Sequence, residues 1–292
     1  AALIQNNWAS NCFKIYTCKD HRPSMEILVV GDCHGEIPEI PDDRDFDLVL
    51  AVGDICGGTD EMRSAMFQAR DEEEEWQEIF GKEEARREVE KSIEEGKEIL
   101  EKLNSLEVPV LIVPGNWDWT RENSDWSFFD GKGYPRMLEE FENVHNLNFD
   151  AEEINDWKFV GYGPCSGPEL PQYEDDEPET EEERGELQKD YQEKKDTLQG
   201  LMDGSDKTVL LSHNAPHNTS LDKIDNEDSP VHGRHYGSVI VRELVEEFSP
   251  EFSVAGHMHE AEGEETLKET KCLNTGLQNM WVLDTEEGFQ EI

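Results

Sequence analysis

Aspartate, asparagine and histidine side chains recur in this sequence shortly after apolar runs. The runs lie at residues 27–30, 46–52, 108–113, 208–211 and 252–255. The polar residues that follow them are Asp32, His34, Asp54, Asn116, His213, His257 and His259. Short runs rich in β-branched residues predict buried strands, and α/β folds collect their ligands at the carboxyl ends of strands. We therefore expect these polar side chains to gather where several strands end.

These donors are carboxylate, amide and imidazole groups, with no thiolate among them. The set suits manganese, iron, zinc, nickel or cobalt better than it suits a structural cysteine–zinc site. Two ions need a bridging ligand, and a carboxylate has two oxygens. Two ions about 3.5–4 Å apart can hold a hydroxide between them and neutralise a phosphoryl group during in-line attack. The competing interpretation, ordinary loop and core residues, has to explain all of these residues at strand ends.

The chain of 292 residues carries 26 basic and 70 acidic residues, a net charge of −44. A broad basic face is therefore lacking, which disfavours long nucleic acid and anionic membranes as partners. The acidic residues are spread along the whole chain, which fits an acidic interaction tail poorly. Such a distribution is typical of the solvated surface of a protein from a salt-rich cytoplasm, as in a halophile, where salt screens the self-repulsion.

The six cysteines form no C-x-x-C pair, and a chain of this length needs no disulfide framework, so we expect reduced thiols. No segment approaches the roughly 20 apolar residues of a membrane span, and none has the pattern of a secretory leader. The expectation is a soluble, cytoplasmic protein, of an oligomeric state that the sequence does not indicate.

The segments between the apolar runs predict a layered α/β architecture, because strand-like and helical patterns alternate. Helices are expected within residues 60–106, with a break near Gly81, and at 181–202 and 239–248. Ser238 is a suitable N-cap for the last of these helices. Further strands are expected at residues 158–162, 272–277 and 279–283.

Two segments stand apart in composition. Residues 1–24 carry more basic than acidic side chains, and Met25 directly precedes the first predicted strand, so we expect an extension of little structural consequence before a domain at 25–292. The alternative is an N-terminal arm that packs on the body. Residues 169–206 form an acidic, proline-punctuated insert, which we interpret, like the helical stretch at 60–106, as a surface excursion.

The order of these motifs resembles that of the calcineurin-like metallophosphoesterase superfamily. The motifs are GDxH at 31–34, GDxxG at 53–57, GN-x-D at 115–118, a strand-borne His213, and GHxH at 256–259. The resemblance extends over roughly residues 25–292. It implies a four-layer α/β sandwich, in which two mostly mixed sheets are flanked by helices and a dimetal site lies at the carboxyl edge of the strands.

The resemblance also implies a ligand set and a reaction. Asp32, His34, Asp54 and His259 would hold the first metal, and Asp54, Asn116, His213 and His257 the second, with Asp54 as the bridge and manganese as the expected ion. The reaction implied is hydrolysis of a phosphate ester by a metal-bridging hydroxide, with Asp54 and Asn116 in the catalytic centre.

One position departs from the family pattern. Many phosphomonoesterases of this family carry a histidine after the motif asparagine, where it protonates the leaving group, but this chain has Trp117. An indole N–H cannot shuttle a proton. In similar proteins without that histidine, phosphodiesters and activated leaving groups are favoured. Asp118 remains a candidate catalytic residue, although it lacks the histidine that it would orient and a structural role is at least as plausible. His235, ahead of His217, is the candidate replacement acid.

The leading hypothesis is therefore a dimetal, phosphodiester-leaning phosphoesterase with a small phosphate-ester substrate, such as a nucleotide or a lipid-derived diester. The alternative enzyme is a phosphomonoesterase or protein phosphatase in which another histidine supplies the proton. A non-catalytic scaffold of the same fold is disfavoured because such proteins have typically lost metal ligands, and this chain keeps them all.

Overall fold

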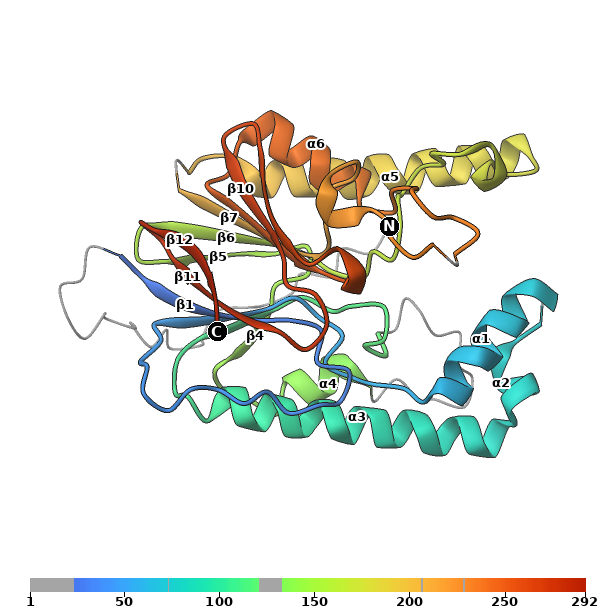
Figure 1. Ribbon diagram of the computed structural model, residues 1–292, viewed down its shortest axis with the longest axis horizontal. Coiled ribbons are helices and arrows are strands. Elements are labelled where there is room, and N and C mark those ends of the chain that lie inside the picture. The colour runs from blue at the N-terminus through green and yellow to red at the C-terminus, as the bar shows by residue number, and fades with distance from the viewer. Residues whose placement is uncertain (1–23, 73, 121–132, 206, 228) are drawn as a thin grey trace, which may run out of the picture.

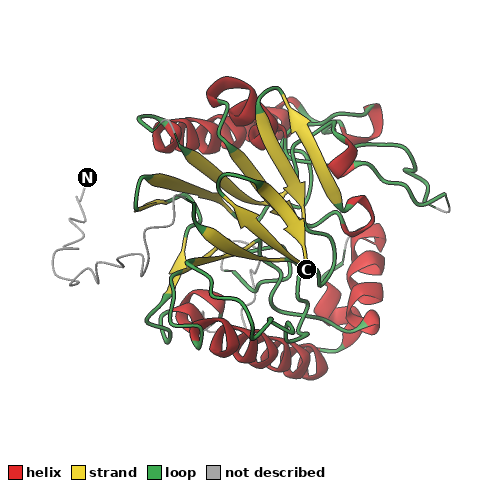
Figure 2. Cartoon of the chain, turned by 60° about the vertical axis from the view of Figure 1, so that its left-hand side comes forward, coloured by secondary structure: helices red, strands yellow, loops and turns green. Residues whose placement is uncertain are grey.

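Two six-stranded sheets pack face to face in the computed structural model (Figure 1). The structure describes residues 24–72, 74–120, 133–205, 207–227 and 229–292, so the expected extension at 1–24 lies outside the described residues except for Ser24. Helices cover the outer face of each sheet, and Figure 2 shows the strands of both sheets between them. The predicted fold class, a four-layer α/β sandwich with mixed sheets, is confirmed.

The first sheet contains the strands that follow the amino-terminal motifs. Its central strands run parallel to one another, and β11 is antiparallel to both of its neighbours. The strand order is β12 (Gly288–Glu291), β11 (Met280–Asp284), β1 (Glu26–Val30), β2 (Leu48–Ala51), β3 (Val110–Ile112) and β4 (Val144–Asn146).

The second sheet contains the strands of the carboxyl-terminal motifs. Four central strands are parallel, and an antiparallel strand closes each edge. The order is β5 (Ala151–Ile154), β6 (Trp157–Tyr162), β7 (Thr208–Asn214), β8 (Phe252–Gly256), β10 (Thr270–Asn274) and β9 (Gly263–Leu267).

Alternation along the buried strands builds the layers. In β1, Ile27 and Val29 face the core between the sheets, whereas Leu28 and Val30 face the helices outside. Side chains that alternate across a strand reach opposite faces, so each central strand contributes to two hydrophobic cores. The core between the sheets fixes their carboxyl edges relative to each other, and those edges carry the polar motifs.

The helices divide between the two outer faces. The helices on the first sheet are α1 (Asp60–Glu72), α2 (Trp76–Phe80), α3 (Lys82–Asn104) and α4 (Tyr134–Leu138). Those on the second are α5 (Glu181–Met202) and α6 (Val239–Phe248). Short 3-10 turns occupy Glu174–Asp176, Ser220–Asp222 and His259–Ala261. None of the helices in the described part of the chain is long and apolar enough to cross a bilayer.

The long helices follow the sequence pattern closely. The expected helices at 181–202 and 239–248 coincide with α5 and α6, and the Ser238 hydroxyl accepts a hydrogen bond of 3.0 Å from the Val241 N–H, as a cap should. The break near Gly81 is also confirmed, since this glycine has φ of 97° between α2 and α3. Within the acidic insert, α5 buries Tyr191, Leu198 and Met202 against the second sheet.

Several short elements had no clear signal. The sequence pattern did not predict α4, β4, β5, β9 or β12. In β9 (Gly-Glu-Glu-Thr-Leu) no side chain is fully buried, because it is an edge strand paired on one side only, with β10. A strand with few apolar side chains cannot be predicted from hydrophobic periodicity, because its conformation depends on pairing with the neighbouring strand.

Candidate metal centre

The polar residues after the strands come together in two groups. Asp32, His34 and His259 each offer one ligand atom within 4.8 Å of the others, and so do Asp54, His213 and His257. The strands that carry them are central in their sheets: β1 and β2 in the first, β7 and β8 in the second. The centre therefore lies where the carboxyl edges of the two sheets meet, and it draws on both.

The first group is held together by short contacts. His259 Nε2 lies 3.2 Å from Asp32 Oδ2 and 3.2 Å from His34 Nε2. The backbone N–H of His257 donates to Asp32 Oδ2 at 2.7 Å, which ties the end of β8 to the end of β1. Asp32 is fully buried, and its other oxygen, Oδ1, accepts no hydrogen bond from any described residue.

The second group includes the asparagine of the third motif. His213 Nε2 lies 2.9 Å from Asn116 Oδ1, while His213 Nδ1 lies 2.9 Å from the carbonyl of Val52. The Val52 carbonyl and Asn116 Oδ1 can both only accept, and a neutral imidazole carries a single proton. With that proton on Nδ1, the lone pairs of Nε2 and Asn116 Oδ1 face each other, an arrangement that a shared cation would satisfy. His213 was expected just beyond its strand, but β7 continues to Asn214 with a register shift after Leu211. Such an irregularity re-aims a side chain.

Asp54 connects the two groups. Its Oδ2 lies 3.6 Å from His34 Nε2 and 3.5 Å from His213 Nε2, so one carboxylate oxygen faces a histidine of each group. Its Oδ1 accepts a hydrogen bond of 2.7 Å from the backbone N–H of Trp117. That bond orients the carboxylate and leaves Oδ2 toward both histidines.

Three residues of the centre have left-handed backbone conformations. His34, Asp54 and His257 have φ of 46°, 48° and 67°, in a region that side-chain-bearing residues rarely occupy. Local hydrogen bonds hold the turn after β1, because the N–H of His34 donates to the carbonyl of Asp54 at 2.8 Å. Strained backbone at strand ends persists where the surrounding structure fixes it, and functional sites are where it concentrates.

Two glycines allow the carboxylates to approach the neighbouring chain. A Cβ at Gly115 would collide with the carboxylate and backbone of Asp54, and a Cβ at Gly256 would collide with the carboxylate of Asp32. Any side chain at either position would push the loops of the centre apart. The glycines in the GN and GH motifs are therefore required by close packing.

Excess negative charge is buried at the centre. Asp32, Asp54 and Asp118 are all at most 1% exposed. Burial, together with the charges of Asp32 and Asp118, raises the pKa of Asp54 well above its ordinary value. Burial also raises the pKa of Asp118, against the hydrogen bonds that it accepts. For Asp32, burial opposes ionisation, but the hydrogen bond with His259 and the nearby histidines outweigh it and lower the pKa.

Two histidines of the centre, His34 and His257, are held neutral. Burial is the main cause that lowers the pKa of His34 to about 4, and burial with the charge of His213 lowers that of His257 to about 3. A neutral imidazole offers a lone pair to a cation, whereas an imidazolium repels one.

These residues fit divalent cations. Asp32 Oδ1 is a buried oxygen without a hydrogen-bond donor among the described residues, and clustered carboxylates repel one another until a cation neutralises them. Ligands about 2.1 Å from one octahedral cation stand roughly 3 Å apart. The separations of 2.9 to 3.6 Å between donor atoms here are of that size.

Asp118 lies beside the centre without facing it. Its Oδ1 accepts from the backbone N–H of Cys56 at 3.0 Å, and its Oδ2 accepts from the N–H of Gly115 at 2.8 Å. Both oxygens are therefore engaged in joining the loop after β2 to the loop after β3. This geometry suits a residue that positions Asp54 and Asn116.

The structure places Trp117 against the first group. Its ring centroid lies 6.2 Å from that of His34 in an edge-on arrangement, and 6.3 Å from that of Trp119. A Cβ on Gly58 would collide with the indole, so the ring rests directly on that backbone. An indole occupies the position where the resemblance implies a proton-donating histidine.

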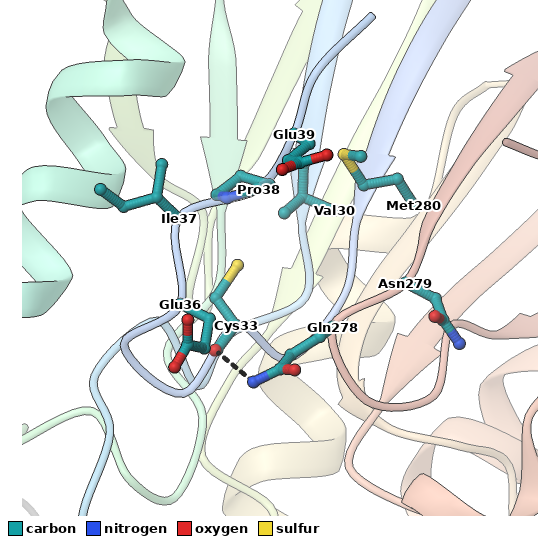
Figure 3. Close-up of a pocket in the computed structure, with 9 residues that line it drawn as sticks. All are labelled: Val30, Cys33, Glu36, Ile37, Pro38, Glu39, Gln278, Asn279 and Met280. Carbon is teal, nitrogen blue, oxygen red and sulfur yellow. Dashed lines mark hydrogen bonds between the residues drawn. The ribbon is translucent and has the colours of Figure 1, made fainter.

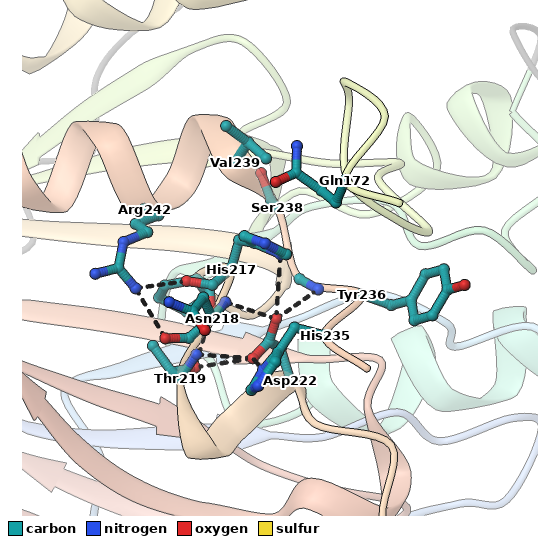
Figure 4. Close-up of polar contacts among 12 residues, drawn as sticks. Gln172, His217, Asn218, Thr219, Asp222, His235, Tyr236, Ser238, Val239 and Arg242 are labelled. Carbon is teal, nitrogen blue, oxygen red and sulfur yellow. Dashed lines mark hydrogen bonds and ion pairs between the residues drawn. The ribbon is translucent and has the colours of Figure 1, made fainter. Parts of the chain in front are cut away.

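His235 belongs to a separate cluster around Asp222 (Figure 4). His235 Nδ1 lies 2.7 Å from Asp222 Oδ1, and its side chain is 24% exposed. His217 Nδ1 lies 3.5 Å from Asp222 Oδ2, too long for a strong hydrogen bond. Burial opposes ionisation of Asp222, but both histidines and the backbone N–H groups of Thr219 and Gly237 outweigh it and lower the pKa to about 2.

A pocket of about 280 Å³ adjoins the turn after β1 (Figure 3). Cys33 and Gln278 line it, and Gln278 Nε2 donates to the carbonyl of Cys33 at 3.4 Å. None of the ligand candidates lines this pocket, and two of its walls are the carboxylates of Glu36 and Glu39. The pocket is therefore distinct from the metal centre, and the charges of these two carboxylates would repel a phosphate.

Sequence reasoning missed several residues that support the site. Asn274 Nδ2 donates to the carbonyls of Met258 and Ala261, at 2.7 and 2.9 Å, and so fixes the loop that carries His259. Asp222 gave no signal at all, because nothing about an aspartate in a polar loop indicates burial.

Comparisons with known proteins agree with this geometry. The family model of the calcineurin-like phosphoesterases matches residues 25–261. No curated protein sequence gives a significant match.

Solved structures add a likeness of fold. One crystal structure, 15% identical, covers 92% of this chain and 98% of its own, with a TM-score of 0.61. The protein TT1561 of Thermus thermophilus covers 92% and 98% at 15% identity, with a TM-score of 0.52. A dimetal phosphatase from Danio rerio covers 93% and 98% at 10% identity, with a TM-score of 0.46. At these identities the likeness concerns the fold alone.

Proposed function

This chain belongs to the calcineurin-like phosphoesterase family, and we propose that it is a two-metal hydrolase of a small phosphate ester with a preference for phosphodiesters. The observation that carries the proposal is the position of Asp54 Oδ2, 3.6 Å from His34 Nε2 and 3.5 Å from His213 Nε2. A carboxylate oxygen between a histidine of each group would serve both metal sites, as a two-metal hydrolase requires.

The proposed ligands divide between two ions. Asp32, His34, Asp54 and His259 would hold the first, and Asp54, Asn116, His213 and His257 the second. We propose manganese, because oxygen and imidazole donors without thiolate suit it. Bound there, the ions would activate water as the nucleophile and neutralise the charge that develops on the phosphoryl group.

The surrounding residues orient these ligands. The Val52 carbonyl fixes the tautomer of His213, and the Trp117 N–H fixes the rotation of the Asp54 carboxylate. Asp118 joins the loops that carry Asp54 and Asn116, so we assign it a positioning role in place of a proton-transfer role. Such outer contacts typically change metal affinity or activity by about 10- to 100-fold when they are removed.

Trp117 supports the diester preference. A leaving group of high pKa has to be protonated as it departs, and the indole N–H is a donor of negligible acidity. Hydrolysis without a nearby acid favours good leaving groups. Replacing Trp117 by histidine should therefore raise hydrolysis of a monoester with a poor leaving group relative to that of bis-para-nitrophenyl phosphate, and an unchanged ratio would contradict this role of Trp117.

A second reaction, phosphomonoester hydrolysis, is favoured by the pair of His235 and Asp222. A buried carboxylate 2.7 Å from Nδ1 orients the imidazole, and an oriented imidazole can serve as a general acid. His235 is also partly exposed, so a substrate could reach it.

His235→Gln separates these reactions. If His235 is the acid, the variant should lose about tenfold or more in kcat for a monoester with a poor leaving group, and little for para-nitrophenyl phosphate. His217→Gln is the matched control, since it removes the other histidine beside Asp222. Equal losses for both leaving groups would exclude His235 as the acid.

The test of the whole proposal is hydrolysis of bis-para-nitrophenyl phosphate and para-nitrophenyl phosphate by metal-stripped protein, in high salt, before and after manganese is added. Metal-dependent cleavage that favours the diester supports the proposal. Monoester preference would keep the two-metal reaction and favour His235 as the acid. Absence of cleavage of both substrates by protein that has bound two ions would refute the enzymatic proposal and favour a non-catalytic scaffold.

A further inference from the structure

An arginine without an anionic partner among the described residues lies beside the metal centre. Arg63, in the first turn of α1, is half-buried, and its Nε is buried and donates to no described residue. Among the described ranges of the chain, no carboxylate pairs with its guanidinium. The protein has 70 acidic and 26 basic residues, so an arginine that forms an ion pair with none of the described carboxylates is unexpected.

The position of Arg63 is fixed by Trp117. Its guanidinium carbon lies 5.2 Å from the centroid of the indole, within the range of a cation–π interaction. The indole in turn rests on the backbone of Gly58 and meets Trp119 edge-on. Trp119 Nε1 donates to Ser92 Oγ at 2.8 Å, which anchors this aromatic pair to α3. The guanidinium is thus held on a rigid platform.

This platform faces the metal centre. The backbone N–H of Trp117 bonds to Asp54, and its ring contacts that of His34. Arg63, stacked on this ring, therefore places its positive charge on the side of the centre that carries the first group.

Burying a guanidinium without an anion is costly, so a half-buried arginine with no carboxylate partner in the described part of the chain indicates that an anion binds there. The planar fork of arginine matches two oxygens of a phosphate, and charge-assisted pairs of this kind are the stronger hydrogen bonds of proteins. Beside a centre of the kind proposed above, the anion at hand is the phosphoryl group of the substrate.

We propose that Arg63 binds the phosphoryl oxygens of the substrate beside the metal centre, and that Trp117 positions Arg63 for this contact. The inference rests on the proposed function. Trp117 would then have two effects on the site. It stands in place of a proton-donating histidine, and its ring supports the arginine that binds phosphate. The substrate class follows as an anionic phosphate ester whose recognition depends on one arginine fork.

The experiment measures binding of inorganic phosphate to manganese-loaded protein by titration calorimetry, with manganese content checked for every variant. Arg63→Met should weaken phosphate binding by about tenfold or more, since charge-assisted hydrogen bonds are lost. Arg63→Lys keeps the charge without the fork, so we expect an intermediate loss. Arg87→Met is the control, because Arg87 is an exposed arginine paired with Glu84 on α3.

A double-variant cycle tests the role of Trp117. Trp117→Leu should raise KM for bis-para-nitrophenyl phosphate by about as much as Arg63→Met, with a smaller effect on kcat. In the Arg63→Met background, Trp117→Leu should leave KM almost unchanged, because its effect acts through the missing arginine. Additive effects would contradict the positioning role.

The outcomes separate this inference from the proposed function. If manganese-loaded wild-type protein binds phosphate through Arg63 but cleaves neither ester, the hydrolase proposal fails and the anion site stands. If the protein cleaves esters while Arg63→Met and Arg63→Lys keep the wild-type phosphate affinity and KM, the inference about Arg63 is wrong. Wild-type protein that loads manganese but does not bind phosphate would also overturn it.

Discussion

Two clusters of aspartate and histidine lie in this molecule, one at the metal centre and one around Asp222, and they solve the burial of charge in opposite ways. Asp222 is fully buried, yet it accepts hydrogen bonds from the backbone N–H groups of Asn218, Thr219 and Gly237 and from His235. At the metal centre, Asp32 Oδ1 accepts none from the described residues, and Asp54 is buried beside the charges of Asp32 and Asp118.

The pKa values of Asp222 and Asp54 reflect this difference between the two clusters. Donors supplied by the protein lower the pKa of Asp222 to about 2, whereas burial and like charge raise that of Asp54. A carboxylate that the protein itself satisfies is a structural or proton-orienting group. The pKa alone does not mark the difference, because burial also raises the pKa of Asp118, whose two oxygens accept backbone hydrogen bonds. The carboxylates that we propose as cation ligands are those with an oxygen turned toward the histidines, as in Asp54.

The sharpest test of this comparison replaces the aspartate of each cluster. Asp54→Asn should reduce kcat/KM by about a thousandfold or more, because the bridge between the ions is lost. Asp222→Asn should reduce it far less, since Asp222 touches no proposed ligand. Steady-state kinetics on bis-para-nitrophenyl phosphate with saturating manganese measures both, and turnover retained by Asp54→Asn would remove Asp54 as the bridge.

Metal removal should also divide the two clusters. Manganese at about a hundred times its Kd should stabilise the wild-type fold by about 2.7 kcal/mol, which is roughly 5 °C or more in Tm. Asp222→Asn should keep this shift, and Asp54→Asn should lose most of it. In the metal-free state, Asp54→Asn should melt no lower than wild type, because a repelled buried charge is gone. Calorimetric scans with and without chelator measure these shifts, and a metal-dependent shift preserved in Asp54→Asn would contradict the assignment.

Lowering the pH should remove the stabilisation that Asp222 provides within a defined pH range. The pKa of Asp222 falls from an ordinary 3.8 to about 2 on folding, so its stabilisation is present above about pH 4 and is lost as the pH drops toward about 2. That shift corresponds to about 2 kcal/mol. Wild type should lose that much more unfolding free energy than Asp222→Asn across this window, as measured by urea unfolding at micromolar protein. If the unfolding free energies of wild type and Asp222→Asn changed with pH in parallel, Asp222 would not be stabilised by the hydrogen bonds that the structure shows.

The smallest effect is expected for the longer contact within the Asp222 cluster. His217→Gln should cost less than about 1 kcal/mol at neutral pH, because Nδ1 stands 3.5 Å from the carboxylate and a partly exposed ion pair contributes little. Urea unfolding of this variant beside Asp222→Asn gives the comparison. Losses of the same size in both would mean that His217 is as tightly bound to Asp222 as His235 is.

Local patterns carried a large part of the fold. Helices α5 and α6 were predicted with their bounds, because a helical pattern fills each segment and a capping residue, Thr180 or Ser238, directly precedes it. The edge strand β9 was not predicted, since its side chains are only partly buried and its conformation comes from pairing with β10. A helix whose own residues specify it can be predicted from the sequence, whereas an edge strand that depends on pairing with a neighbour cannot.

The sequence by itself determined which donors the chain offers and their order along it. Asp32 and Asp54 could be named because each follows a strand that its own residues specify, and His213 because it lies near the end of one. Tertiary structure decided what those donors face. The packed core between the sheets brings one oxygen of Asp54 between histidines from different sheets, and the core between the first sheet and its helices sets Arg63 of α1 on the ring of Trp117. Those contacts join residues far apart in the chain, so the positions of whole layers fix them and no local pattern encodes them.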